Sequence, residues 1–348
     1  MRLNGETDLN FNNYTENRGT GFGFPPDYYF YEREERRKKK IRDLRFIGST
    51  AGICVILYVV LQNAMSMVIV FEPIRTLYFG NEIFRSLITI ILSILGLLVP
   101  FVLGAVALRR RKLLTDLRLE KPEGKALTLT VIPFGFLICL VGNYLTSWFL
   151  ILTKDAGVEL TSPETATPDS LFGRIIYAIS VAVVPPLVEE FALRGVIMQP
   201  LRKYGDWFAI LATSAVFAIL HGNLVQAPFA FIAGIGIGYA VCITNSIWTG
   251  IIIHFCNNFY SVAVDFLIND IADENLLNMI WDFSQATLYA VCIILSVAFM
   301  FIRGRKKINR VPAMLTAAEK AKALFVNVPM IVAIVIMLII TAEYVRLM

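Results

Sequence analysis

Residues 173–200 read GRIIYAISVAVVPPLVEEFALRGVIMQP. The stretch is long enough to cross a bilayer, because roughly 20 predominantly apolar residues span the hydrocarbon core as a helix. It nevertheless contains two adjacent prolines and the charged residues Glu189, Glu190 and Arg194. A charge at the bilayer centre costs about 3 kcal/mol even on mild scales. This composition therefore predicts a membrane helix that contributes polar groups to a site inside the bilayer.

The rest of the chain has the composition of a membrane protein. It has 348 residues, of which 57% are hydrophobic and 17% charged, with a mean hydropathy of +0.65. Soluble domains contain about a quarter charged residues. The apolar residues form long runs, which predict an all-α polytopic helical bundle of about eight to nine transmembrane helices. The nine candidate spans are about 46–70, 86–108, 127–153, 173–200, 207–223, 225–244, 246–268, 285–302 and 325–345.

Four regions follow from this pattern. Residues 1–45 are polar and then basic, without the apolar segment of a signal peptide, and we predict a disordered cytoplasmic tail. Residues 46–165 hold three spans, 166–270 a four-helix core, and 271–348 the C-terminal spans. In residues 313–324, Lys320 and Lys322 lie among apolar residues. This pattern indicates an interfacial helix before the last span.

The basic residues predict the orientation. Arg and Lys cluster before the first span, between the second and third, after the fourth and after the eighth, whereas the alternate loops are poor in them. Such clusters stay on the cytoplasmic side. We therefore predict a multi-pass protein of the cell membrane with a cytoplasmic N-terminus and an external C-terminus. Because the basic residues flank the apolar runs, the net charge of +5 is explained by membrane topology, and nucleic acid is not an expected partner.

The five cysteines carry no catalytic or structural signal. They all lie in apolar segments, and no two of them form a CxxC pair. We expect neither a disulfide nor a thiolate zinc site from them.

Five polar residues inside apolar runs indicate one shared cavity: Glu189, Glu190, Arg194, His221 and His254. Glu189 lies 13 residues before Arg202, and His221 lies 14 residues after Trp207. At about 1.5 Å per residue, both lie roughly 20 Å from the same boundary. His254 lies only eight residues past Ser246, roughly 12 Å deep, so its level matches less closely.

Helical spacing groups the same residues in pairs. Glu190 and Arg194 are four residues apart and can form an ion pair on one helix face. Phe217 and His221 have the same spacing, as do His254 and Asn258, which lie together on a third span. Glu189 is turned about 100° from Glu190. One glutamate can therefore face a cavity while its neighbour binds Arg194.

Three motifs in this order resemble those of the CPBP intramembrane proteases. Glu189-Glu190-Phe-Ala-Leu-Arg194 resembles EExxxR, Phe217-Ala-Ile-Leu-His221 resembles FxxxH, and His254-Phe-Cys-Asn-Asn258 resembles HxxxN. The family includes CAAX-prenyl endopeptidases and bacteriocin-processing or self-immunity (Abi-type) proteins. The resemblance covers about residues 170–270.

The resemblance implies peptide-bond hydrolysis by an activated water. Glu189 is then the expected general base, with His221 orienting the water. His254 and Asn258 are expected to donate hydrogen bonds to the oxyanion, while Arg194 holds Glu190. Which of the two glutamates is the base stays open. So does a zinc ion held by Glu189, His221 and His254, a set with three protein ligands.

The expected substrate is a membrane peptide or a lipidated protein terminus within the lipid bilayer. A CAAX-like terminus, a bacteriocin and a signal peptide all fit this description. Two other functions are compatible with the same residues. A proton-coupled transporter also uses buried Glu and His, and a non-catalytic membrane scaffold or regulator could retain the fold.

Overall fold

The computed structural model describes residues 26–163, 167–304, 308 and 314–347. Contacts divide the chain into two units, Met1–Lys40 and Ile41–Met348. In the first unit, the described residues form the beginning of helix α1 (Pro26–Ile69), which continues into the second unit. Residues 26–45 are thus helical, contrary to the predicted disordered tail, whereas residues 1–25 lie outside the described residues.

Local ion pairs explain the helix at the start of α1. Glu32 pairs with Arg36, and Glu35 with Lys38, one helical turn apart. Such pairs each stabilise an isolated helix by about 0.2–0.5 kcal/mol. The charged sequence that suggested disorder therefore contains regularly spaced opposite charges that favour a helix.

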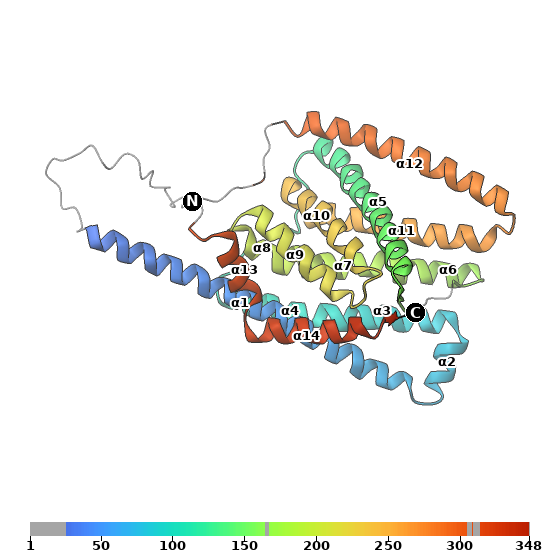
Figure 1. The fold of residues 1–348 in the computed structure, drawn as a ribbon, viewed down its shortest axis with the longest axis horizontal. Helices are drawn as coiled ribbons and strands as arrows, with labels where there is room; N and C mark the ends of the chain where they lie inside the picture. The colour runs from blue at the N-terminus through green and yellow to red at the C-terminus, as the bar shows by residue number, and fades with distance from the viewer. Residues whose placement is uncertain (1–25, 164–166, 305–307, 309–313, 348) are drawn as a thin grey trace. The chain divides into compact units, whose positions relative to one another are not determined.

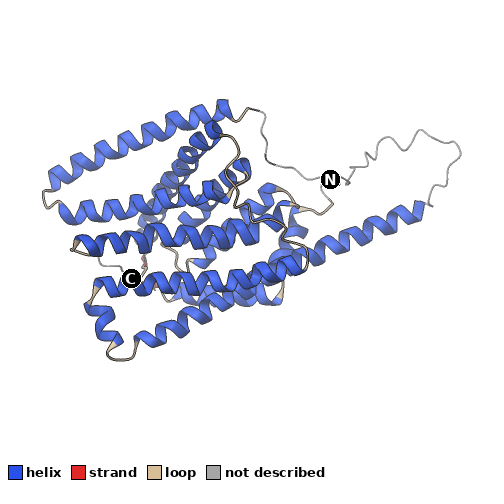
Figure 2. Ribbon diagram, turned by 180° about the vertical axis from the view of Figure 1, so that it is seen from behind, coloured by secondary structure: helices blue, strands red, loops and turns tan. Residues whose placement is uncertain are grey.

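The second unit consists almost entirely of helices, as the sequence predicted (Figures 1 and 2). After α1 follow α2 (Ile74–Gly80), α3 (Glu82–Ser93), the π-helix η2 (Ile94–Leu98), α4 (Val99–Arg110), α5 (Lys125–Asp155), β1 (Val158–Leu160), α6 (Leu171–Ala178), the π-helix η3 (Ile179–Val183), α7 (Val184–Glu190), the π-helix η4 (Phe191–Ile197), α8 (Met198–Arg202), α9 (Asp206–Leu220), α10 (Ala227–Thr244), α11 (Ile247–Asp270), α12 (Glu274–Ile302), α13 (Ala317–Phe325), α14 (Val328–Ala342) and β2 (Val345–Leu347).

Seven described helical segments are long and apolar enough to cross a membrane. An eighth span results if α13 and α14, which meet at an angle of 77°, are counted as one. The fifth predicted span, 207–223, corresponds to α9, which has only 15 residues. That length is about 22 Å, shorter than the hydrocarbon core of about 30 Å. The prediction of a bundle is confirmed, with α9 as a shorter helix inside it.

The loop after α9 is tied together by its own polar groups. Asn223 donates to the carbonyl of His221 at 2.9 Å and to Gln226 at 3.1 Å, and its Oδ1 accepts from the Gln226 backbone N–H. Irregular backbone at membrane depth requires such satisfied groups or burial in protein. The loop therefore fixes His221 at the end of α9.

Helix α5 joins the N-terminal spans to the predicted core. It packs along α10, α11 and α12, and a Cβ on its Gly135 would come within 2.5 Å of Ile253. On the opposite side of α10, Gly234 lies so close to α9 that a Cβ there would be 2.8 Å from the Ser214 hydroxyl. Small residues of this kind allow membrane helices to approach closely.

A short antiparallel pairing of β1 with β2 was absent from the sequence prediction. Glu159 is paired with Arg346 in the register. Because β1 follows α5 and β2 follows α14, these two helices end on the same side of the unit.

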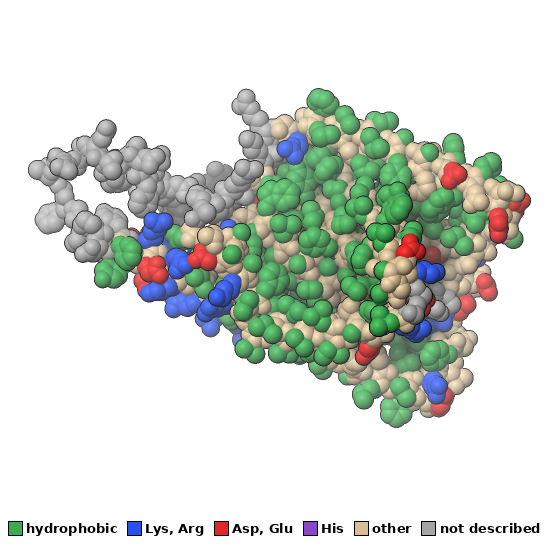
Figure 3. Space-filling model, in the orientation of Figure 1, with side chains coloured by type: hydrophobic (Ala, Val, Ile, Leu, Met, Phe, Trp, Pro, Cys, Tyr) green, Lys and Arg blue, Asp and Glu red, His purple; other side chains and the backbone are tan. Residues whose placement is uncertain are grey.

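The outer surface of the helices is apolar. Hydrophobic side chains cover most of the face visible in Figure 3. Phe301, Ile294 and Leu338 are each more than half exposed. Exposed apolar areas of this extent are typical of proteins that contact a membrane, and they agree with a multi-pass membrane protein.

Candidate active site

The helix that carries the two glutamates is irregular. Between Leu171 and Arg202 it alternates α-helical and π-helical turns, with Glu189 and Glu190 at the end of α7 and Arg194 in η4. π-helical turns inside α-helices occur frequently at functional sites. The irregularity has a local cause, because Pro185 has no N–H to donate to the carbonyl of Val181 one turn earlier.

Asn258 replaces that missing donor. Its Nδ2 donates to the Val181 carbonyl oxygen at 3.0 Å, from the facing helix α11. An unpaired carbonyl buried inside the membrane would cost about 1–3 kcal/mol. Asn258 thus holds the proline-interrupted helix against α11, a contact that the sequence prediction did not include.

Glu190 and Arg194 form a fully buried ion pair. Arg194 Nη1 donates to Glu190 Oε1 at 2.8 Å, and both side chains are 0% exposed. Arg194 Nη2 donates to the carbonyl of Gly234 at 3.3 Å, and the guanidinium lies 4.8 Å from the centre of the Phe217 ring. The predicted pairing of these two residues is therefore present, and the ring adds a cation–π contact.

His254 lies between the two glutamates. Its Nδ1 is 3.0 Å from Glu190 Oε1, and its Nε2 is 3.8 Å from Glu189 Oε2. A carboxylate can only accept a hydrogen bond, so Nδ1 carries the proton that is shared with Glu190. Glu189 remains 24% exposed, whereas Glu190 is 0% exposed. The two neighbouring glutamates thus face different surroundings, as their 100° offset predicted.

His221 is oriented by its own helix. Its Nδ1 lies 2.9 Å from the carbonyl oxygen of Phe217, four residues earlier. Because a carbonyl only accepts, Nδ1 is the donor, and Nε2 is left as the basic nitrogen of the neutral ring. The Phe217 ring is close to both histidines, with its centre 4.8 Å from that of the His221 ring and 5.7 Å from that of the His254 ring.

Gly250 makes room for the buried carboxylate. It lies on α11 one turn before His254, and a Cβ there would come within 3.0 Å of Glu190 Oε2. That oxygen has no hydrogen-bond partner among the described residues. A larger residue at position 250 would displace Glu190 from His254 and Arg194. No motif in the sequence marks Gly250, although its spacing of four from His254 places it on the same face.

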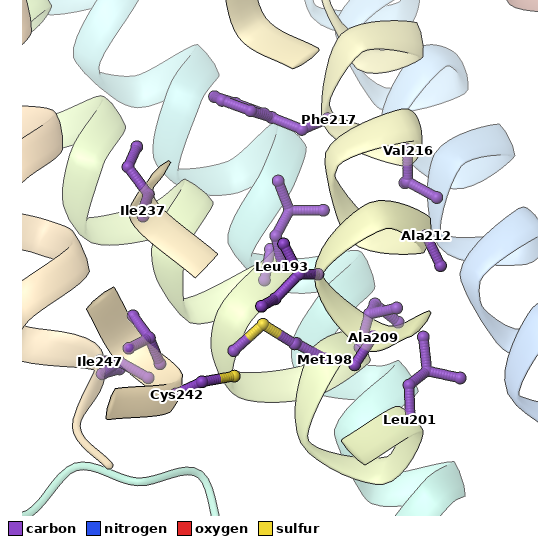
Figure 4. Close-up of a cluster of buried hydrophobic side chains, with 14 of the residues drawn as sticks. Leu193, Met198, Leu201, Ala209, Ala212, Val216, Phe217, Ile237, Cys242 and Ile247 are labelled. Atoms are coloured by element: carbon purple, nitrogen blue, oxygen red, sulfur yellow. The ribbon is translucent and has the colours of Figure 1, made fainter. Parts of the chain in front are cut away.

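A buried apolar cluster supports the site. Leu193, Met198 and Cys242 lie in the cluster of Figure 4, with Phe217 at its upper end. Phe217 is only 2% exposed. Phe217 therefore lies beside the site, as predicted. Its ring contacts the polar residues on one side and this cluster on the other.

A chain of side-chain amides continues from Asn258 into α5. Asn257 donates to Asn258 Oδ1 at 3.3 Å, and Asn143 of α5 donates to Asn257 Oδ1 at 3.3 Å. The three amides donate in one direction and end on the Val181 carbonyl. Asn143 and Asn257 were missed because they belong to no motif, and only the packing of α5 on α11 brings them together.

Tyr58 of α1 is a further neighbour of Glu189. It is within electrostatic range of that carboxylate, and it is half-buried against the core. It lies on the face of α1 that carries Cys54 and Gln62, which contact Pro100 and Gly96 of the next span. The π-helix η2, which contains Gly96, packs in turn against α7. Sequence analysis did not identify this neighbour, because Tyr58 and Glu189 are 131 residues apart.

The open zinc alternative required three donors in one place. Among the residues that the structure describes, no three His, Cys, Asp or Glu side chains are arranged to hold a metal ion. Nδ1 of His254 faces Glu190, and Nδ1 of His221 faces its own helix. Both contacts leave Nε2 of each ring free, as in metal-binding histidines whose other nitrogen donates to a carboxylate or a carbonyl. A zinc ion held by Glu189, His221 and His254 therefore stays a prediction.

Similarity to known proteins agrees with this arrangement. Residues 171–260 match the family model described as type II CAAX prenyl endopeptidase Rce1-like. The chain is also 25% identical over 225 residues to the membrane-embedded CAAX protease MroQ of Staphylococcus aureus (strain USA300), covering 62% of this chain and 90% of that protein. No solved structure matches the chain. Residues 171–260, which contain all three motifs, are thus similar to CAAX-type intramembrane proteases, and this similarity supports the resemblance to the CPBP family.

Proposed function

We propose that the chain is an intramembrane endopeptidase that hydrolyses a peptide bond of a membrane peptide or of a lipidated protein terminus. The observation that carries this proposal is the partly exposed carboxylate of Glu189, 3.8 Å from a histidine that a buried Glu190–Arg194 pair holds in place. The name of the relative, a CAAX protease, supports a CAAX-like terminus as the substrate class. Maturation of a bacteriocin or a signal peptide remains the second substrate class.

In the first step, Glu189 takes a proton from a water molecule as the water oxygen attacks the scissile carbonyl carbon. A new C–O bond forms, and the carbonyl π electrons move to oxygen. A positioned general base contributes about 10²–10⁴-fold to the rate. Nε2 of His221 is a hydrogen-bond acceptor in the neutral ring, which suits it to hold the second proton of the same water.

The oxyanion requires hydrogen-bond donors that are already in position. His254 serves as a donor when its ring is doubly protonated, because Nδ1 then stays on Glu190 and Nε2 carries a proton as well. Asn258 uses its amide in the contact with Val181. We therefore assign the oxyanion contact to His254 first and the alignment of α11 to Asn258.

In the second step, the tetrahedral intermediate collapses. The oxyanion electrons re-form the carbonyl, the C–N bond breaks, and the proton held by Glu189 is transferred to the leaving nitrogen. The products are a carboxylic acid and an amine, so atoms and charge balance without a further reactant. Glu190 and Arg194 act as positioning residues, because their ion pair fixes His254 from the side opposite Glu189.

The test is cleavage by the purified full-length protein. Wild type and the variants Glu189→Ala, His221→Ala and His254→Ala are incubated in detergent with membrane peptides that end in a prenylated or an unprenylated cysteine. We expect cleavage by the wild type and loss in all three variants. Glu274→Ala, which removes an exposed glutamate at the start of α12, is the matched control and should cleave normally.

The outcomes separate the competing functions. Full activity of Glu189→Ala would refute the mechanism. Equal rates before and after rigorous chelation agree with a mechanism without metal, and loss that zinc restores would contradict it. A wild type that cleaves neither peptide, together with a cellular phenotype that survives Glu189→Ala, would favour a non-catalytic scaffold.

A further inference from the structure

A second cavity lies outside the proposed catalytic site. It is formed by α5, α11 and α12 and has a volume of about 470 Å³. Small-molecule sites commonly have volumes of about 300–1,000 Å³. Neither the two glutamates nor the two histidines of the active site line it. The cavity is therefore separate from the proposed catalytic site.

The wall of the cavity is aromatic and carries a single charged group. Tyr260, Trp281 and Tyr289 line it together with the carboxylate of Asp265, and no basic side chain does. Asp265 accepts a hydrogen bond from Tyr177 at 3.4 Å. Among the described residues it forms no ion pair with a Lys or Arg. Its negative charge is therefore available to a cationic ligand in the cavity.

The polar groups around the carboxylate are held in place. Gln285 donates to the Tyr260 hydroxyl at 2.6 Å, and Tyr289 donates to the carbonyl of Leu140 at 3.4 Å. These bonds connect all three helices across the cavity and fix the orientation of two rings. The rings are therefore arranged before any ligand arrives, which lowers the entropy that binding would cost.

The depth of the cavity agrees with the headgroup region of a bilayer. Asp265 lies five residues before the end of α11, and Trp281 seven residues after the start of α12. These positions are roughly 7–10 Å from the helix ends. The polar region of each leaflet is about 5–8 Å thick, and Trp and Tyr are enriched at its boundary. A ligand can therefore enter the cavity from the membrane surface.

We propose that this cavity binds an organic ammonium ion, with Asp265 as the counter-ion and the aromatic rings as its walls. Aromatic side chains attract substituted ammonium groups through the negative face of each ring, and they recognise choline in this way. The negative charge and the absence of basic lining residues exclude an anion. The ammonium group belongs either to a lipid headgroup or to a free small molecule, and both sources share this chemistry.

The first arm of the test measures binding of a free cation. The full-length protein is purified in a maltoside detergent without ammonium groups and titrated with tetramethylammonium and choline in a calorimeter. We expect saturable binding to the wild type, with the dissociation constant of Asp265→Asn raised about tenfold or more. Asp282→Asn, which removes an exposed carboxylate next to Trp281 but outside the cavity, is the matched control and should bind as the wild type does.

The second arm distinguishes the sources. The wild type and Asp265→Asn are placed in nanodiscs of phosphatidylcholine or of phosphatidylglycerol, and their thermal midpoints are compared. A higher midpoint in phosphatidylcholine that Asp265→Asn abolishes supports a lipid headgroup. Binding of the free cation without such a lipid effect supports a small molecule.

Three results would overturn the proposal. One is a wild type that neither binds the free cations saturably nor has a higher thermal midpoint in phosphatidylcholine than in phosphatidylglycerol. Another is equal affinity of the wild type and Asp265→Asn. The third is equally tight binding of 3,3-dimethylbutanol, the uncharged analogue of choline. If Asp265→Asn does not fold, Trp281→Leu replaces it, and unchanged affinity in that variant also contradicts the aromatic wall.

Discussion

The two sides of α7 carry the same residue type in opposite environments. Glu190 is fully buried and contacts both Arg194 and His254. Glu189, the preceding residue, is partly exposed, and its Oε2 lies 3.8 Å from Nε2 of His254. A carboxylate whose charge is already neutralised positions its neighbours, whereas one that is not can exchange a proton. We therefore propose that Glu190 positions its neighbours and that Glu189 acts as the general base.

The largest expected effect comes from neutralising the exposed side. Glu189→Gln keeps the shape of the side chain but removes the base. We expect the rate of peptide cleavage, measured as kcat/KM, to fall by about 10²–10⁴-fold because general-base catalysis is lost. The thermal midpoint in detergent should stay near the wild-type value, because the replaced oxygen belongs to the partly exposed side chain.

Glu190→Gln is the matched variant for this prediction. It should lower the thermal midpoint, because the buried Arg194 would lose its carboxylate. If Glu190→Gln were stable and inactive while Glu189→Gln stayed active, the roles of the two sides would be reversed.

Removing Arg194 tests the buried side directly. Arg194→Met leaves Glu190 as an uncompensated charge, and breaking a buried pair costs about 3–5 kcal/mol. We expect the free energy of unfolding in a mixed-micelle titration to fall by about 3 kcal/mol or more. The double variant Glu190→Gln with Arg194→Met should recover most of this loss, because no lone charge remains. Equal stability of the single and double variants would contradict the assignment.

A smaller effect is expected where Asn258 meets the proline-interrupted helix. Asn258→Ala leaves the Val181 carbonyl without a donor, which costs about 1–3 kcal/mol. Pro185→Ala restores a backbone N–H one turn from Val181. We therefore expect Asn258→Ala to cost less in a Pro185→Ala background than in the wild type, as measured by a double-mutant cycle on unfolding. Additive losses would show that Asn258 does not compensate for Pro185.

The smallest expected effect concerns Tyr58. Its hydroxyl lies within electrostatic range of Glu189, so we expect Tyr58→Phe to lower kcat/KM by about twofold to fivefold, the size of a weak electrostatic contact of about 0.5–1 kcal/mol. The effect should appear in kcat/KM and leave the thermal midpoint unchanged. Tyr78→Phe on α2 is the matched control. A loss of equal size in both variants would point to a general effect on folding.

Most spans could be predicted from the sequence because apolar length alone determines them. The exceptions are instructive. Helix α9 is too short to cross the core, because the loop from His221 to Gln226 is held by side-chain hydrogen bonds that hydropathy does not detect. The α13–α14 bend and the β1–β2 pairing depend on contacts between distant segments. The helical charged residues of α1 depend on ion pairs rather than on burial.

The candidate site divides in the same way. The Glu190–Arg194 pair follows from a spacing of four on one helix, and it is present. The contact of Glu190 with His254 joins residues 64 positions apart, and only helix packing determines it. No sequence motif includes Gly250, Tyr58 or Asn143. Only their neighbours in the folded chain connect them with the site. The roles of His221 and Asn258 in catalysis remain predictions for the cleavage assay.

The position of Arg194 also bears on how the protein enters the membrane. Its carboxylate partner is four residues away on the same helix, so the pair can form as soon as that helix does. Its other contact, the carbonyl of Gly234, lies on α10 and is synthesised later. Each unpaired charge would add about 3 kcal/mol to the insertion of that segment. Glu190 and Arg194 can therefore leave the translocon as a neutralised pair, before the helices that complete the site have been made.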